Sequence, residues 1–321
     1  MPITAYLGVA MHRFVMVCSA LLAMGCGDNA ADISGTGIFS LGVTDAPVDS
    51  ADAVVVTFTE VQLLGGDDEL LQSFVPATPR QIDLLSLAGG LSELLVDAEV
   101  IPAGRYQQIR LLIDAPSPSC QNPSAPFASF ITIDGTEFPL VVPSGAQSGL
   151  KLNGPIDVPA GGAAAYTIDF DLRRSVTERG NTGCFNLRPS LRLVENDQIG
   201  GLRGEVAPEL LTASSCTADP ATGEGSAVYL YAGDGVAPDD LDGSGAEVLT
   251  SLRILAPTGT DTNFSYAAGF LPPGPYTVAF SCQAGDDRAE QDDDIEFSPA
   301  QSAVVVVGNE TTVNFTGQEG P

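Results

Sequence analysis

The chain has 321 residues, of which 44% are hydrophobic and 17% charged, and its 13 Lys and Arg against 41 Asp and Glu give a formal net charge of −28. This balance argues against nucleic acid as a partner, because phosphates are bound by basic stripes that the chain lacks. The acidity is interpreted as a solvated surface, with cation binding as the alternative. The length predicts about two domains, and 35 Gly with 23 Pro predict short strands joined by turns.

The N-terminus carries an export signal. His12 and Arg13 form a short positive region, which is followed by an apolar run and then by Gly25 and Cys26. The run is too short to span a bilayer as a stable anchor. It resembles a bacterial lipoprotein signal, and that resemblance implies cleavage before Cys26 and attachment of a diacylglycerol to this cysteine. We therefore expect contact with a membrane through the lipid.

The boundaries follow from this interpretation. Residues 1–25 are the predicted signal peptide, with Met11 as the true start, and residues 26–32 are the predicted lipidated tether. The residues just before the lipidated cysteine of such a signal form a short motif, the lipobox, and Ala23 and Met24 depart from its commonest form. An ordinary secretory signal or an uncleaved helix is therefore the alternative. Gly27, where an inner-membrane lipoprotein has aspartate, predicts the outer membrane of the bacterial cell envelope, on its periplasmic or surface face.

The first predicted domain spans residues 33–197. Alternating apolar positions predict strands over 37–45, 53–63 and 167–173. Between them, residues 82–95 have helical spacing, and their Gly pair predicts one or two short turns. Residues 101–113 are the stretch around which the domain is organised, because Pro102 and Gly104 predict a tight turn that feeds a strand opened by Tyr106.

Several short motifs in this domain occur in a fixed order, and together they resemble the DUF4382 family of bacterial envelope lipoproteins. The resemblance implies a β-rich fold and an envelope location, and it supplies no catalytic residue. The motifs are Val43-Thr44-Asp45-Ala46-Pro47, Asp83-Leu84-Leu85, Pro102-Ala103-Gly104-Arg105-Tyr106-Gln107-Gln108-Ile109-Arg110-Leu111, Pro143-Ser144-Gly145, Ser148-Gly149-Leu150-Lys151-Leu152, Ile168-Asp169-Phe170-Asp171 and Leu187-Arg188-Pro189.

Carboxylates on one strand face offer a candidate metal site. Asp169 and Asp171 alternate with buried positions, so both lie on the polar face of their strand. With Asp45 or Asp49 they are candidate Ca²⁺ ligands. The competing interpretation pairs them with nearby cations, and the candidates for that role are Arg173, Arg174 and Lys151. No loop with the ligand spacing of a calcium motif accompanies them, which favours the ion pairs.

The second predicted domain spans residues 198–321. Short strands are expected over 202–206, 227–231, 263–266, 276–280, 303–307 and 312–315. Pro272, Gly274 and Tyr276 repeat the Pro-x-Gly-x-Tyr pattern of the first domain. The predicted fold class is therefore all-β, with two antiparallel β-sandwich domains, Ig-like or prealbumin-like, in tandem after the signal peptide. The order of motifs resembles the transthyretin-like, carboxypeptidase-regulatory-like modules, which implies a spacer or binding scaffold.

Acidic loops interrupt this second domain. Residues 239–245 superficially resemble an EF-hand loop, but the alignment puts Pro238 at the first ligand position and Leu249 at the last, so the motif fails. Asp286 and Asp287, and likewise residues 292–294, are interpreted as solvated loop charge.

Four cysteines remain once Cys18 and Cys26 are assigned to the signal and the lipid. Two lie in each predicted domain, and export to an oxidising compartment predicts disulfides. Pairing within each domain predicts the bridges Cys120–Cys184 and Cys216–Cys282.

The only histidine, His12, lies in the signal, so the mature chain has no imidazole for a triad or a zinc site. We expect no enzymatic activity and no cofactor. The favoured function is a lipid-anchored protein that presents a non-catalytic binding or adhesion surface to an unidentified protein or polysaccharide. A structural or assembly role in the envelope is the first alternative. A Ca²⁺-dependent or carboxylate-based hydrolase is the second.

Overall fold

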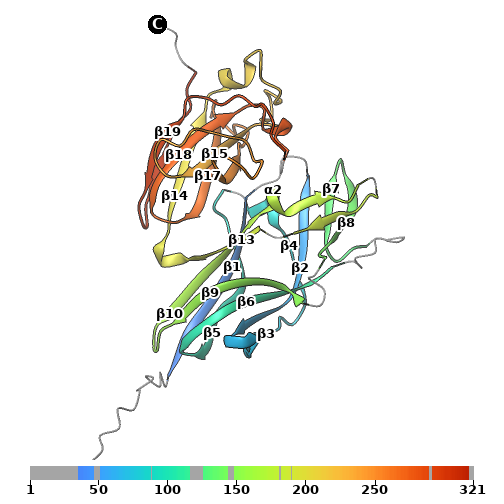
Figure 1. Cartoon of the computed structure of the whole chain (residues 1–321), viewed down its shortest axis with the longest axis vertical. Coiled ribbons are helices and arrows are strands. Elements are labelled where there is room, and N and C mark those ends of the chain that lie inside the picture. The colour runs from blue at the N-terminus through green and yellow to red at the C-terminus, as the bar shows by residue number, and fades with distance from the viewer. Residues whose placement is uncertain are drawn as a thin grey trace, which may run out of the picture. The chain divides into compact units, whose positions relative to one another are not determined.

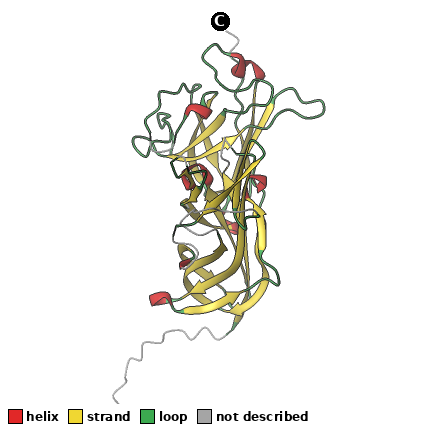
Figure 2. Ribbon diagram, turned by 90° about the vertical axis from the view of Figure 1, so that its right-hand side faces the viewer, coloured by secondary structure: helices red, strands yellow, loops and turns green. Residues whose placement is uncertain are grey.

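The computed structural model describes residues 35–46, 51–87, 89–115, 126–143, 148–180, 182–188, 190–288 and 291–317. Strands dominate these ranges, and helical turns are short segments between them (Figure 2). None of the helices in the described ranges has the length and apolar character needed to cross a membrane. The predicted all-β fold class is confirmed.

The N-terminal half, up to residue 197, forms two sheets (Figure 1). One has the strand order β13-β10-β1-β5, and the other has the order β11-β12-β8-β7-β2-β6-β9, with β3 and β4 also paired to β2. The strands are β1 (Thr36–Ala46), β2 (Ala53–Leu64), β3 (Leu70–Phe74), β4 (Arg80–Asp83), β5 (Glu93–Pro102), β6 (Gly104–Asp114), β7 (Phe130–Ile133), β8 (Thr136–Val141), β9 (Leu150–Val158), β10 (Ala163–Asp171), β11 (Val176–Glu178), β12 (Phe185–Leu187) and β13 (Ser190–Glu195). The helical turns are η1 (Gly66–Asp68), η2 (Leu84–Leu87), α2 (Leu172–Ser175) and η3 (Asn196–Gln198).

The two sheets of this half share one core. Buried apolar residues alternate along both strands, at Phe39, Leu41 and Val43 of β1 and at Ala164, Tyr166, Ile168 and Phe170 of β10. They belong to the same core as buried residues of β2 and β6. Phe58 on β2 meets Phe170 on β10 edge to face, with ring centroids 6.1 Å apart. The half is therefore a sandwich, as the alternation predicted.

The C-terminal half, from residue 198, also forms two sheets, with strand orders β17-β14-β20 and β16-β15-β18-β19. Its strands are β14 (Gly200–Val206), β15 (Ala227–Ala232), β16 (Val248–Arg253), β17 (Phe264–Leu271), β18 (Gly274–Ser281), β19 (Gln301–Val305) and β20 (Glu310–Thr312), and its helical turns are η4 (Pro208–Thr212) and η5 (Ala284–Asp286). Phe315 packs against Tyr266 and Phe280, which come from different sheets. The halves have separate sheets and separate cores, and the domain boundary near residue 198 stays a prediction.

Some elements differ from the expectation. The sheets are mixed rather than purely antiparallel, because β1 pairs parallel with β10, β8 with β12, and β14 with β20. Among the described residues of the stretch 82–95, only those of η2 are helical. The end of this stretch, from Glu93, belongs to strand β5. Strand β10 ends at Asp171, and Leu172 to Ser175 form a helical turn with Leu172 fully buried. Strand β16 was not predicted.

The Pro-x-Gly-x-Tyr stretches have the same geometry in both halves. Gly104 and Gly274 both have a φ of +154°, a backbone conformation that side-chain-bearing residues rarely adopt. The Tyr106 hydroxyl donates to the Pro102 carbonyl at 2.7 Å, and the Tyr276 hydroxyl donates to the Pro272 carbonyl at the same distance.

These turns connect the two sheets of a sandwich, and the strands on either side of each turn do not pair with each other. Strand β5 pairs with β1 while β6 pairs with β2 and β9, and β17 pairs with β14 while β18 pairs with β15 and β19. The apolar residue before each proline, Ile101 or Leu271, is buried. The motif is therefore an inter-sheet corner that a buried tyrosine holds closed.

We expect the corner to be sensitive at its glycine and its hydroxyl. Gly274→Ala should cost about 1–3 kcal/mol of unfolding free energy, because alanine is strained at this φ. Tyr276→Phe should cost about 1 kcal/mol through the lost hydrogen bond. Chemical denaturation of the full chain measures both effects. As the control, Gly66→Ala should change stability little, because Gly66 has no positive φ and an added Cβ there makes only ordinary contact. Equal effects at Gly274 and Gly66 would contradict the strain.

Candidate functional site

The predicted calcium ligand Asp169 is engaged in an ion pair. It lies opposite Arg192 across the β10–β13 ladder, and its Oδ2 accepts from the Arg192 guanidinium at 2.5 Å. Burial raises the pKa of the Asp169 carboxyl, and the charge and hydrogen bond of Arg192 oppose that shift. The sequence predicted an ion pair but did not name Arg192, which approaches Asp169 through strand pairing and not through sequence proximity. Pairing of these carboxylates with Arg173 or Arg174 stays a prediction, because those two side chains lie outside the described ones.

Among the other predicted ligands, Asp171 lines the same pocket as Asp169 and Arg192. Asp171 lies opposite Ser190, and the parallel register of β1 and β10 sets Asp45 beside Phe170. Asp49 lies outside the described residues. A calcium site at Asp45, Asp49, Asp169 and Asp171 stays a prediction, and the register gives it no support.

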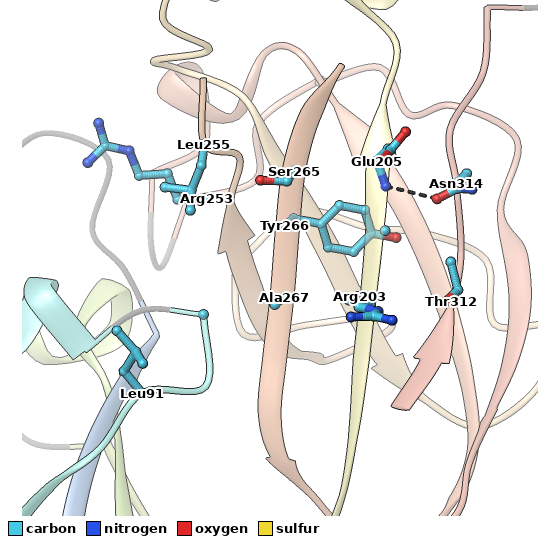
Figure 3. Close-up of a pocket in the computed structure, with 12 residues that line it drawn as sticks. Leu91, Arg203, Glu205, Arg253, Leu255, Ser265, Tyr266, Ala267, Thr312 and Asn314 are labelled. Carbon is cyan, nitrogen blue, oxygen red and sulfur yellow. Dashed lines mark hydrogen bonds between the residues drawn. The ribbon is translucent and has the colours of Figure 1, made fainter. Parts of the chain in front are cut away.

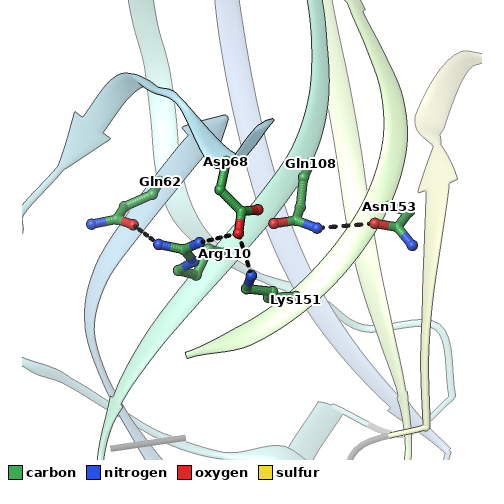
Figure 4. A network of polar contacts seen from close by, with 6 residues as sticks. All are labelled: Gln62, Asp68, Gln108, Arg110, Lys151 and Asn153. Atoms are coloured by element: carbon green, nitrogen blue, oxygen red, sulfur yellow. Dashed lines mark hydrogen bonds and ion pairs between the residues drawn. The ribbon is translucent and has the colours of Figure 1, made fainter. Parts of the chain in front are cut away.

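Lys151, a candidate partner of Asp169, belongs to a different polar network. Gln62, Arg110 and Lys151 occupy neighbouring register positions on β2, β6 and β9. Figure 4 shows Asp68 of η1 between the two cations, at 2.8 Å from Lys151 Nζ and 3.6 Å from Arg110 Nη2. The hydrogen bond from Lys151 is the largest cause of a lowered pKa of Asp68. Beside it, the Gln108 amide donates to Asn153.

This network holds the η1 turn against the outer side of the sheet. Asp68 has a φ of +60°, so it sits in a left-handed turn, and the two cations fix its side chain on the sheet. Two buried atoms of the network, Gln108 Oε1 and Arg110 Nε, have no hydrogen-bond partner in the described structure. We assign the network a structural role.

A groove lies over the outer face of the sheet β17-β14-β20 (Figure 3). Arg203 and Glu205 of β14 alternate with buried residues and point outward, and their register partners on β17 are Ala267 and Ser265. The lining residues from this half are Arg203, Gly204, Glu205, Arg253, Leu255, Ser265, Tyr266, Ala267, Thr312 and Asn314.

Gly204 and Tyr266 close the bottom of this groove. A Cβ on Gly204 would lie 1.6 Å from the Val313 carbonyl oxygen, so only glycine fits there. The same carbonyl accepts from the Tyr266 hydroxyl at 2.6 Å, and burial raises the pKa of Tyr266 well above its ordinary range. The Glu205 amide donates to the Asn314 side chain (Figure 3). The floor is therefore fixed by hydrogen bonds.

The charges of the groove nearly balance. Arg203 pairs with Glu310 at 3.0 Å, and Glu205 accepts from the Asn263 amide at 2.7 Å. Arg253 is exposed and pairs with no carboxylate in the described part of the chain. Sequence reasoning missed these residues, although the alternation of Arg203 and Glu205 with apolar residues was a signal for an outward polar face. Only the tertiary structure places residues of β16, β17 and β20 beside Arg203 and Glu205.

The predicted disulfides fall partly on described residues. Cys184 is buried and disulfide-bonded, and its predicted partner Cys120 lies outside the described residues, as does Cys26. Cys216 and Cys282 are free thiols in this structure. The thiol of Cys216 lies beside Cys282, 3.5 Å from its carbonyl oxygen. Burial, followed by the hydrogen bond with Cys216, raises the pKa of the Cys282 thiol to about 12.

We expect Cys216 and Cys282 to form a bridge after oxidation. The two residues are 66 positions apart, and the chain-entropy model gives about 4 kcal/mol for closing a loop of this size. Non-reducing peptide mapping of the exported chain should find Cys216 joined to Cys282 and Cys120 joined to Cys184. As a control, the reduced sample should yield four alkylatable thiols. A cross-link between the halves would contradict the predicted boundary near residue 198.

Comparison with known families supports the resemblance seen in the N-terminal half. Residues 36–189 match the model of a family described as "Domain of unknown function (DUF4382)". The description assigns no activity to the family. A search of curated protein sequences finds no relative of this chain.

Some solved structures are weakly similar to this chain. The minor pilin GBS52 of Streptococcus agalactiae shares 9% identity over 88% of this chain and 99% of its own, with a TM-score of 0.19. The Bacillus anthracis TIE protein shares 8% identity over 88% of this chain and 34% of its own, with a TM-score of 0.19. The major pilin of Streptococcus pyogenes shares 10% identity over 88% of this chain and 98% of its own, with a TM-score of 0.16. These scores are too low to carry an argument.

Proposed function

We propose that this chain is a lipid-anchored protein of the bacterial outer membrane that presents a non-catalytic binding surface. The lipobox at Cys26 and the tether over 26–32 support the anchor. The match of residues 36–189 to DUF4382 is consistent with the envelope location that the family resemblance implies. The groove on the sheet β17-β14-β20 is the single observation that carries the binding function.

The groove is suited to a polar, uncharged polymer. Its outward side chains are guanidinium, carboxylate, amide and hydroxyl groups, which can donate to and accept from sugar hydroxyls. The net charge of −28 repels acidic polymers, whereas the balanced charges of the groove do not disfavour a neutral ligand. We therefore assign a neutral polysaccharide to this surface.

Binding is proposed in preference to catalysis because of the side chains on offer. Ser265 and Thr312 bring hydroxyls to the groove, but an unactivated hydroxyl is a weak nucleophile. The only imidazole of the chain is His12, in the predicted signal peptide.

The anchor is tested at its cysteine. Cys26→Ser should abolish labelling by radioactive palmitate and release the chain from membranes, because the diacylglycerol is attached through this thiol. Membrane fractionation after expression in a bacterium measures the release. Cys18→Ser is the matched control and should remain labelled. A Cys26→Ser chain that stays labelled and membrane-bound would place the anchor elsewhere.

Arg253, which pairs with no carboxylate among the described residues, provides the test of the groove. The purified full-length chain should bind at least one of a panel of neutral polysaccharides, and Arg253→Ala should weaken that binding about tenfold, as expected for the loss of a charged hydrogen bond. Biolayer interferometry measures the change. Arg188→Ala removes another exposed arginine, outside the groove, and should have no effect.

The controls separate the groove from general charge effects. Alginate, a polyuronate, should not bind, because the chain is strongly acidic. Equal binding of neutral and acidic polymers, equal effects of the two arginine variants, or capture of an envelope protein in place of any polysaccharide would contradict the assignment.

A further inference from the structure

Two acidic loops of the C-terminal half meet on one sheet face. The first follows β15 and contains Asp239, Asp240 and Asp242, and the second follows η5 and contains Asp287, Asp292, Asp293 and Asp294. For the first loop the sequence offered only a failed EF-hand match, and for the second it predicted solvated charge. In the structure Asp240 of the first loop is 3% exposed, and the side chain of Asp293 in the second is 8% exposed, so Asp293 is more buried than predicted. The two loops are far apart in the sequence, and the fold brings them together.

Two buried tyrosines fasten these loops to the sheet. Tyr229 and Tyr231 are fully buried and occupy alternate positions on β15, so they share a face. The Tyr229 hydroxyl donates to Asp287 Oδ2 at 2.5 Å. The Tyr231 hydroxyl donates to the Asp239 carbonyl at 2.5 Å and accepts from the Asp239 amide at 3.0 Å. These hydrogen bonds hold Asp239 and Asp287 in fixed positions relative to strand β15.

Direct bonds also tie one loop to the other. The Leu241 amide donates to Asp287 Oδ1 at 3.1 Å, and the Asp293 amide donates to Asp240 Oδ2 at 2.5 Å. Below them a small apolar core forms, in which Phe297 meets the Tyr229 ring edge to face at 5.1 Å. The loops are held by packing as well as by hydrogen bonds, so their carboxylates are preorganised.

Asp240 is at the centre of the resulting cluster. It groups with Asp287 and Asp293, and also with Asp242 and Asp292, and in each trio one carboxylate oxygen per residue lies within 4.8 Å of the others. Two oxygens that bind the same Ca²⁺ at 2.3–2.6 Å can be up to about 5 Å apart, so these oxygens are close enough together to share one calcium ion. Mg²⁺ is less suited to such a site, because it requires near-ideal octahedral geometry and gives up its water reluctantly.

One buried carboxylate oxygen of this cluster, Asp240 Oδ1, has no hydrogen-bond partner among the described residues. The nearby cation Arg288 pairs with Asp293 at 2.5 Å from a side chain that is 65% exposed. A buried carboxylate oxygen among other carboxylates is costly unless a cation or a donor satisfies it.

The trio of Asp240, Asp242 and Asp292 is the more available of the two, because Asp240 and Asp292 each keep a carboxylate oxygen that accepts no hydrogen bond from the described residues. Asp242 accepts from the Ser244 amide and hydroxyl, one on each oxygen. Both oxygens of Asp293 likewise accept from Arg288, and both oxygens of Asp287 accept from protein donors. Asp292 is exposed and accepts no hydrogen bond within the described residues. Solvent can therefore supply the remaining ligands that calcium takes, since it binds six to eight oxygens.

We propose that Asp240, Asp242 and Asp292 bind a calcium ion, with Asp287 and Asp293 adding negative charge beside it. Oxygen-only ligands fit a hard cation and give no preference to zinc or copper. The site is distinct from the sequence-predicted one at Asp169, and it does not depend on the groove. Calcium bridges the two loops and fixes them on the outer face of β15.

The test is calorimetry of the purified full-length chain with CaCl₂ in chelator-treated buffer at physiological salt. We expect one saturable site with a Kd of about 10⁻⁴ M, in the range of extracellular calcium modules. Asp240→Asn should weaken binding at least about tenfold and leave the metal-free melting temperature unchanged or higher, because it removes a buried charge. Asp292→Asn, at an exposed position, should also weaken binding and tests the site without risk to folding.

The controls distinguish coordination from charge screening. Asp261→Asn removes an exposed carboxylate of the same half and should leave calcium binding intact. MgCl₂ should give no saturable heat and a smaller rise in melting temperature than CaCl₂. The proposal is overturned by the absence of a saturable isotherm up to about 10 mM, by equal responses to the two metals, or by Asp292→Asn and Asp261→Asn behaving alike.

Discussion

The inter-sheet corner is the constraint on which both sandwiches depend. A chain that leaves one sheet must turn through the apolar layer and enter the other without leaving polar backbone atoms unpaired in the core. In both halves a glycine at φ +154° makes the bend, and a tyrosine two residues later donates back to a proline carbonyl. Because the tyrosine is buried, the bond that closes the corner also fixes where the next strand enters the core. The positions of β6 and β18, the strands beside which the rest of each second sheet assembles, follow from this turn.

The distribution of charge is decided by this framework. The N-terminal half uses its carboxylates in ion pairs across strands, as at Asp169 with Arg192 and Asp68 with Lys151. The C-terminal half instead concentrates carboxylates on two loops and supplies Arg288 near them. The two arrangements have different consequences, because a carboxylate paired with its own cation stabilises the fold, whereas a cluster in which carboxylates outnumber cations has affinity for further cations. Acidic residues are in excess throughout the sequence. In the N-terminal half they form structural ion pairs, and in the C-terminal half they form a candidate cation-binding site.

Much of the fold could be predicted because strand alternation is a local property. The burial of Ile168 and Phe170, the outward direction of Arg203 and Glu205, and the repeated corner motif all follow from residues within a few positions of one another. The pairing of strands could not be predicted. Arg192 reaches Asp169 through a strand contact that no sequence spacing reveals. The pairing of Cys216 with Cys282 was predicted, from the number of cysteines in each predicted domain and not from their spacing. The parallel pairing of β1 with β10 is likewise nonlocal, and it is the reason that Asp45 lies beside Phe170.

The sequence by itself determined the all-β class, the acidic charge and the position of both corners, because composition and short-range pattern suffice for these. Only the tertiary structure decided which side chains meet. The residues of the groove come from β14, β16, β17 and β20, and the carboxylates around Asp240 come from loops on either side of β16, β17 and β18. The physical reason is that a sandwich core is assembled from contacts between distant segments, and its outer faces and loops are brought together only when that core forms.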